Sequence, residues 1–310
     1  GTDGIWECQV DDSLGERPLR LRARQIVNAT GPWADKLPHS QVRLRATKGV
    51  HIVLHRERIP VPDTVVMTEG KRILFAIPWG ERVILGTTDT DYTGPVAAVK
   101  TEPEDIAYLL KVANQFFPSA RLGTKDVISA WAGLRPLIAD PNGKPSDISR
   151  SHQIRNPEPG WWDVAGGKLT TYRLMAEQTV DKVIVSLKAA GALEREPRAC
   201  ATAREPLLPQ SETDGVSGIL PPEVTRRAVE HYCTAEWAIH LDDIMVRRAG
   251  WHYYSPDAAS IAEKAAEWMG EFLGWPAETR AAELRRYLKT TGLRDTPPAP
   301  LDNAKTLIAR

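Results

Sequence analysis

The stretch with the clearest chemical potential reads DVAGGKLTTYR, residues 163–173. An apolar strand end runs into Gly166 and Gly167, whose bare backbone a ligand can approach closely. Lys168 then adds a positive charge, and two threonines that can cap a helix follow. The helix behind them directs its unpaired N–H groups and the positive end of its dipole toward the same place. The pattern predicts a site for an anionic or electron-rich ligand.

Two further side chains have types suited to catalysis. Arg135 stands at a predicted strand end before a proline, and its planar fork suits an alkoxide, carbonyl or phosphate oxygen. The same arginine could instead pair with a carboxylate. His51 lies within an alternating apolar run, and its imidazole titrates near neutrality, as a general base should. A lone histidine in a strand is also commonly structural.

Composition limits the class of protein. The 310 residues include 40 basic and 40 acidic side chains, so no net charge recruits nucleic acid or acidic lipid. Three scattered cysteines indicate neither a disulfide framework nor a zinc site, and we expect no metal. No apolar run approaches the ~20 residues that span a bilayer, and no signal peptide is recognisable. We expect a cytoplasmic protein.

The elements that must position these residues change in type along the chain. A hairpin over 5–24 precedes a short buried parallel strand over 25–28, where ligands of α/β sheets gather. Residues 47–137 read as antiparallel β structure with one helix, which starts at Thr101 and takes Glu104 as its capping-box partner. Strands over 151–155 and 161–165 lead to a helix over 171–190. A linker over 192–220 precedes four helices, expected over residues 223–232, 236–249, 258–272 and 277–289.

Five islands of sequence, in this order and at this spacing, resemble the FAD-dependent glycerol-3-phosphate dehydrogenases of the D-amino-acid-oxidase-like flavoprotein group. They are VNATGPW (27–33), TKGVHI (47–52), PW with GTTD (78–79 and 86–89), AGLRPL (132–137) and GGKLTTYR (166–173). The helical tail, with HLDD at 240–243 and Arg247-Arg248, is also similar to that family's C-terminal domain.

This resemblance implies an α/β plus α+β fold with four segments. They are a remnant of a Rossmann-like FAD-binding domain (1–46), an antiparallel substrate domain with one helix (47–160), a return segment of the FAD-binding domain (161–195) and a C-terminal helical domain (196–310). It implies oxidation of sn-glycerol 3-phosphate to dihydroxyacetone phosphate, with electrons passed to quinone at the cytoplasmic face of the membrane. The membrane surface as a partner follows from the resemblance alone, and a homodimer stays open.

One feature of the family is missing. Its members open with a strand, a G-x-G-x-x-G turn and a helix that hold the FAD pyrophosphate, and no G-x-G-x-x-G occurs in this sequence. We therefore expect the carboxyl-terminal part of a longer enzyme, which by itself binds FAD poorly or not at all.

The resemblance also implies roles for individual residues. Arg135, His51 and Lys168 would be catalytic, with His51 as the general base. Arg135, Lys168, Asp89 and Arg150 would bind substrate, Asp89 by ordering a turn or a nearby lysine. The flavin would be lined by Asn28, Ala29, Gly31, Pro32, Trp33, Gly166, Gly167, Lys168, Leu169 and Thr170.

Two alternatives remain open on the sequence. The chain could be another oxidase of the same flavoprotein group, acting on an amine or a 2-hydroxy acid, or on glycerol 3-phosphate with oxygen as acceptor. It could also be a non-catalytic module whose helical domain binds a partner. Bound flavin and substrate preference would separate these alternatives.

Overall fold

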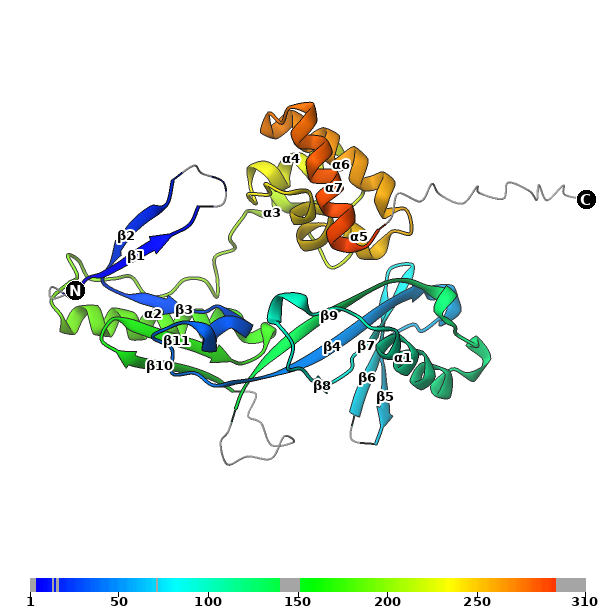
Figure 1. Ribbon diagram of the computed structural model, residues 1–310, viewed down its shortest axis with the longest axis horizontal. Helices are drawn as coiled ribbons and strands as arrows, with labels where there is room; N and C mark the ends of the chain where they lie inside the picture. Colours follow the sequence, from blue (N-terminus) through cyan, green and yellow to red (C-terminus); the bar gives the residue numbers. More distant parts are fainter. Residues whose placement is uncertain (1–3, 13, 15–16, 71, 140–150, 294–310) are drawn as a thin grey trace, which may run out of the picture. The chain divides into compact units, whose positions relative to one another are not determined.

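The computed structural model describes residues 4–12, 14, 17–70, 72–139 and 151–293 (Figure 1). The chain divides into two compact units, each built from several stretches of sequence. Unit 1 comprises 1–50, 88–101 and 132–207, and unit 2 comprises 51–87, 102–131 and 208–310. The division falls inside two long strands, β4 (Leu44–His55) and β9 (Val127–Ile138).

Unit 1 contains a three-stranded sheet in the order β10-β11-β3. Its strands are β3 (Ile26–Asn28), β10 (His152–Glu158) and β11 (Trp161–Gly166). β10 and β11 are antiparallel, whereas β11 and β3 are parallel and place Asn28 opposite Asp163. The parallel strand expected over 25–28 is thus confirmed, although Val27 on it is 44% exposed. Because parallel strands end at the same edge, the loops that follow β3 and β11 leave the sheet side by side.

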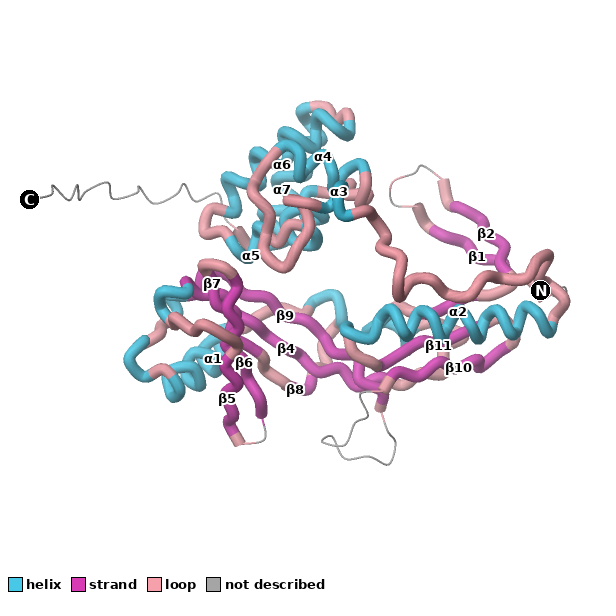
Figure 2. Tube along the Cα trace, turned by 180° about the vertical axis from the view of Figure 1, so that it is seen from behind, coloured by secondary structure: helices cyan, strands magenta, loops and turns pink. Residues whose placement is uncertain are grey.

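A long helix and a hairpin complete unit 1. Helix α2 (Tyr172–Ala189) runs along β10 and β11 (Figure 2), and Lys182 Nζ donates to the Ile154 carbonyl oxygen at 3.4 Å. Strands β1 (Trp6–Val10) and β2 (Leu19–Ala23) form the expected antiparallel hairpin. The helix expected over 171–190 is also confirmed.

The antiparallel structure expected over 47–137 is present. In unit 2, residues 51–55 of β4 pair with β7 (Arg82–Gly86), which pairs with β6 (Arg72–Trp79), which in turn pairs with β5 (Val65–Glu69). In unit 1, β4 pairs with the short β8 (Thr90–Asp91). Helix α1 (Pro103–Phe116) buries Leu109, Val112 and Ala113. Its capping box joins Glu102 and Asp105, so the expected pair Thr101 and Glu104 was wrong by one residue.

The part of unit 2 from residue 208 to residue 293 is largely helical. The helices are α3 (Gln210–Thr213), α4 (Arg226–Thr234), α5 (Trp251–Tyr254), α6 (Ala258–Leu273) and α7 (Ala277–Thr291). They enclose a core that includes the fully buried rings of Tyr232, Trp251 and Tyr287. Among the described residues, no helix is both long and apolar enough to cross a membrane.

The prediction of a helix over residues 236–249 is wrong for the first third of that range. Trp237 has a φ of 52°, which a right-handed helix does not permit. The Asp243 carboxylate accepts hydrogen bonds from the backbone N–H groups of Ile239 (3.0 Å) and His240 (2.9 Å), and so caps a later start. The helical turns begin at Leu241 and include a π-helical segment over Asp243–Arg248.

Candidate active site at the carboxyl edge of the sheet in unit 1

A buried polar pair holds together the two loops at the carboxyl edge of the unit 1 sheet. Asn28, at the end of β3, is 1% exposed, and its Nδ2 donates to Asp163 Oδ1 at 2.8 Å and to the Ala34 carbonyl oxygen at 2.9 Å. Its Oδ1 accepts from the Thr30 hydroxyl at 2.7 Å. The structure therefore gives the Asn28 side chain an internal role, and the flavin contact that the family resemblance implies stays a prediction.

Asp163 is the anchor of this pair, and the sequence interpretation missed it. Its carboxylate is fully buried and accepts from Asn28, from Trp161 Nε1 at 2.9 Å and from the Gln41 backbone N–H at 3.0 Å. Burial of a carboxylate is costly unless donors replace water, and here three of them do. A charged residue between Trp162 and Val164, inside an otherwise apolar strand, was the signal that could have revealed it.

Three glycines shape the loops themselves. Gly31, Gly166 and Gly167 have φ values of 59°, 74° and 78°, in the left-handed region where other residues are strained. A Cβ built on Gly166 would lie 2.8 Å from Ile138 Cδ1, which sets this loop against the end of β9. A Cβ on Gly31 would meet nothing within 4 Å. The backbone at Gly166, in the loop after β11, is therefore close-packed, whereas the backbone at Gly31, in the loop after β3, is open.

The residues after the glycine pair face solvent. Lys168 and Thr170 are exposed, and Leu169 is 88% exposed. The Thr171 hydroxyl donates to the Lys168 carbonyl oxygen at 2.9 Å and makes no side-chain cap to α2. On the neighbouring loop, Ala29 and Trp33 are exposed and Pro32 is half-buried.

Arg135 and Asp89 meet on the same unit. Arg135 Nη1 lies 3.2 Å from Asp89 Oδ1, and Nη2 donates to the Thr88 carbonyl oxygen at 3.2 Å. The guanidinium lies flat on Gly49 of β4, where a Cβ would be only 2.8 Å from Cζ. The side chain of Arg135 is 35% exposed, so its fork is oriented by protein groups and still reachable. Asp89 thus orients an arginine, and its expected role in ordering a turn or a lysine stays a prediction.

His51 belongs to unit 2, where it is half-buried. Its ring stacks on the indole of Trp131 with centroids 5.1 Å apart and planes 18° apart. In the β4–β7 ladder, His51 is opposite Gly86, and a Cβ on Gly86 would lie 2.8 Å from His51 Cγ. The sequence pattern did not predict either neighbour. Of the remaining predicted site residues, Arg150 lies outside the described residues.

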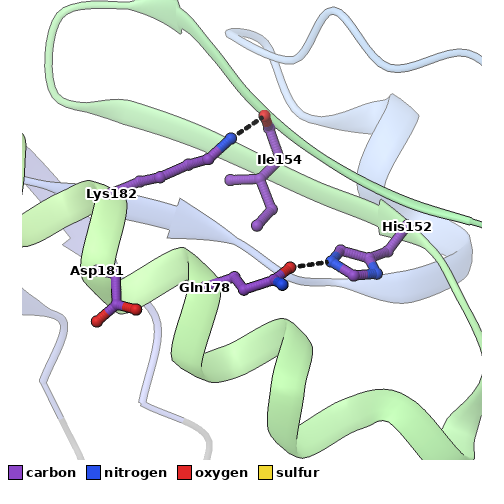
Figure 3. A pocket seen from close by; sticks show the side chains of 5 residues that line it. All are labelled: His152, Ile154, Gln178, Asp181 and Lys182. Carbon is purple, nitrogen blue, oxygen red and sulfur yellow. Dashed lines mark hydrogen bonds between the residues drawn. The ribbon is translucent and has the colours of Figure 1, made fainter. Parts of the chain in front are cut away.

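A separate hollow of about 370 Å³ lies between β10 and α2 (Figure 3). It is lined by His152, Ile154, Gln178, Asp181 and Lys182, and His152 Nε2 is 2.7 Å from Gln178 Oε1. It contains none of the residues predicted for the site. The candidate site therefore rests on the loops after β3 and β11 and on Arg135.

Loops at the carboxyl ends of adjacent parallel strands, glycines in the left-handed conformation and a lysine at a helix start define unit 1 as a ligand-binding α/β unit. The sequence profile of one family, the FAD dependent oxidoreductases, matches residues 2–181. The chain belongs to this family of FAD-dependent oxidoreductases.

Several curated proteins are similar over long stretches. The aerobic glycerol-3-phosphate dehydrogenase of Bacillus subtilis is 39% identical over 204 residues, which are 64% of this chain and 36% of that protein. Glycerol-3-phosphate dehydrogenase 2 of Mycobacterium tuberculosis is 30% identical over 330 aligned positions, covering 92% of this chain and 56% of that protein. The chain thus spans about half the length, or less, of these relatives.

A solved structure extends the likeness to the fold. The glycerol-3-phosphate dehydrogenase of Bacillus halodurans, solved in complex with FAD, superposes with a TM-score of 0.68 at 26% identity. The match covers 92% of this chain and 65% of that one. The expected fold class, α/β plus α+β with a helical C-terminal part, is confirmed.

FAD is the cofactor of this family, and the described loops fit such a group in two respects. Gly31 leaves open space beside the backbone, where a side chain would obstruct a flat ligand. Lys168 adds a positive charge next to the Gly166-Gly167 backbone, which suits an anionic or electron-rich group. Gly166, Gly167, Lys168, Leu169 and Gly31 are the residues that would hold it.

Proposed function

We propose that this chain carries the substrate-side residues of an FAD-dependent glycerol-3-phosphate dehydrogenase, which oxidises sn-glycerol 3-phosphate to dihydroxyacetone phosphate and passes the electrons to quinone. Two supports come from the comparisons, since both the relatives and the FAD-bound structure carry this name. The third support is Arg135. A fork that is held by Asp89 and by Gly49, and that remains reachable, is suited to an anionic oxygen.

The reaction assigns a task to each residue. The C2 hydroxyl loses its proton and C2 loses a hydride, so the alcohol becomes a ketone. FAD, when bound, supplies the chemistry of accepting that hydride. In this proposal His51 takes the hydroxyl proton, while Arg135 and Lys168 hold the phosphate or the oxygen that gains carbonyl character. Asp89 keeps the guanidinium of Arg135 in its orientation.

The contact of Arg135 with a phosphate should contribute more free energy than its contact with Asp89. A hydrogen bond to a charged group contributes about 1.5–3 kcal/mol, and a bidentate pair between arginine and phosphate contributes more. The Arg135–Asp89 pair is partly exposed, so by itself it adds only about 0–1 kcal/mol to stability. Removing Arg135 should therefore affect substrate turnover far more than folding.

The test is Arg135→Ala in the holoenzyme, with Arg135→Lys as the matched variant. We expect kcat/KM for glycerol 3-phosphate to fall at least about tenfold, since one charge-assisted hydrogen bond corresponds to about that factor. The lysine variant should recover part of the loss, because it restores the charge without the fork. Wild-type kinetics in Arg135→Ala would remove this residue from the site.

The acceptor and the substrate class need their own experiment. Reduction of a soluble quinone and uptake of oxygen, measured side by side with glycerol 3-phosphate, separate a dehydrogenase from an oxidase. The same assay with glycine or sarcosine tests the amine alternative. Peripheral attachment to the cytoplasmic face of the membrane, a homodimer and the four-segment domain division belong to the same proposal, and co-sedimentation with lipid vesicles tests the attachment.

A further inference from the structure

A chain of ring contacts connects the candidate base to helix α5 within unit 2. His51 stacks on Trp131, and Trp131 packs on Tyr253 with ring centroids 4.9 Å apart and planes 52° apart. Tyr253 lies on α5, more than 120 residues further along the chain. Trp131 is therefore held between the imidazole and a residue of the helical segment.

Two neighbours restrict the His51 ring. Trp131 covers one face as an almost parallel plane. Gly86 also approaches so closely that any Cβ there would overlap the ring, at 2.8 Å from Cγ and 2.9 Å from Nε2. A flat ring packed against both a backbone and an indole cannot turn freely about its side-chain torsions without displacing one of them.

Tyr253 is itself held firmly. Its carbonyl oxygen accepts from the Ser129 hydroxyl at 2.6 Å, and Ser129 is two residues from Trp131 on β9. Its ring meets His252 edge to face at 4.7 Å, and His252 Nδ1 lies 2.9 Å from the hydroxyl of the buried Tyr287. The position of Tyr253 is thus tied to the helical core.

We propose that Trp131 and Tyr253 are positioning residues, through which helix α5 fixes the orientation of the His51 imidazole. The inference rests on the proposed function, in which His51 removes the hydroxyl proton. A general base acts only within about 2.6–3.2 Å of that proton's oxygen, and a displacement of 1 Å can cost about 100-fold in rate. Neither positioning residue is required to contact substrate, so their loss should lower kcat and leave KM nearly unchanged.

The neighbouring Tyr254 provides a matched control. Its ring packs on Trp79 at 4.9 Å, its hydroxyl accepts from the Glu81 N–H at 3.1 Å, and its carbonyl oxygen accepts from Arg82 Nε at 2.8 Å. Tyr254 therefore docks the same helix on the same sheet without a ring contact to Trp131 in any described pair. A general loss of docking would affect both tyrosine positions equally.

The experiment has two readouts. In the full chain with isotope-labelled histidine, the ring protons of His51 are assigned among the seven histidines by His51→Gln. The indole of Trp131 should shift them upfield. Trp131→Leu should abolish this shift and Tyr253→Leu should reduce it, while Tyr253→Phe and Tyr254→Leu should preserve it. An unchanged His51 spectrum in Tyr253→Leu overturns the inference, whatever the enzyme does.

The second readout is turnover of glycerol 3-phosphate by the holoenzyme. Tyr253→Leu should lower kcat about tenfold with KM within about twofold, and Tyr253→Phe should restore it. A different outcome would refute the positioning role of Tyr253. In that outcome Tyr253→Leu changes the His51 spectrum but keeps the wild-type kcat, while His51→Gln loses activity. Should His51→Gln itself keep full activity, the role of His51 in the proposed function fails, and the spectrum still reports the ring geometry separately.

Discussion

Replacement of Asp163 should destabilise unit 1 strongly. The carboxylate is fully buried and accepts hydrogen bonds from Asn28 Nδ2, Trp161 Nε1 and the Gln41 N–H, at 2.8, 2.9 and 3.0 Å. These donors come from three separate stretches of sequence. Asp163→Ala removes the acceptor from all three at once and leaves a cavity where the carboxylate was.

The magnitude follows from the donors left without an acceptor. Each buried unsatisfied donor costs about 1–3 kcal/mol, and water that enters the cavity relieves part of this. We expect a loss of about 3–5 kcal/mol in the free energy of unfolding, a large part of the ~5–15 kcal/mol of a typical domain. Asp163→Asn keeps the side-chain volume and one acceptor oxygen, but its NH2 group replaces the oxygen that accepts from the Gln41 N–H, so two donors face each other. Its cost should be about 1.5–3 kcal/mol.

Urea unfolding, followed by tryptophan fluorescence, measures both variants, because Trp161 lies against the carboxylate and is 6% exposed. Asp181→Ala is the control, since this aspartate is exposed on α2 and should change stability by less than about 0.5 kcal/mol. A loss below about 1 kcal/mol in Asp163→Ala, or one equal to that of the control, would refute the assignment of Asp163 as the anchor of the two loops.

Two other predictions concern Arg135 and the helical segment. Gly49→Ala should displace the Arg135 guanidinium and lower kcat/KM of the holoenzyme about tenfold, since van der Waals contact needs ~3.5–4.0 Å and only 2.8 Å is present. Gly133→Ala, where a Cβ meets nothing within 4 Å, should leave the Arg135 fork in place in the 15N side-chain spectrum. Burial raises the pKa of Asp242, but hydrogen bonds from Arg286 and a second arginine outweigh it and hold the pKa below its usual range. The stability that ionised Asp242 contributes should be complete above its unfolded-state pKa of ~3.9 and should be lost as pH falls through its lower pKa in the folded protein. The free energy of unfolding in urea should therefore depend less on pH in Asp242→Asn.

Local pattern was sufficient to predict most of the elements. The β1–β2 hairpin, helix α2 and the parallel strand β3 follow from alternation, from the period of apolar residues and from small residues at strand ends. The expected helix over 236–249 failed because its irregular start depends on Asp243 and Trp237 in their tertiary setting. Strand β5 (Val65–Glu69) was not expected, since its identity comes from pairing with β6.

The members of the candidate site stay predictions from the sequence, and their contacts could not be predicted at all. Lys168 and Arg135 stand in short motifs with a recognisable chemical purpose, so residue type and position were enough to propose them. The anchor Asp163 and the partners Trp131 and Tyr253 act through neighbours far away in the sequence, and no local pattern encodes such pairings. Tertiary structure was required to find them.

The glycines in two of the motifs gain a common explanation from these contacts. Neither Gly49 nor Gly86 is in the left-handed region, so conformational freedom does not explain them. At each position a functional side chain occupies the volume that a Cβ would need, Arg135 against Gly49 in unit 1 and His51 against Gly86 in unit 2. Bare backbone in an extended strand offers a flat and rigid surface to a planar guanidinium or imidazole. Both glycines thereby orient the side chain that performs the proposed chemistry, and each should resist replacement even by alanine.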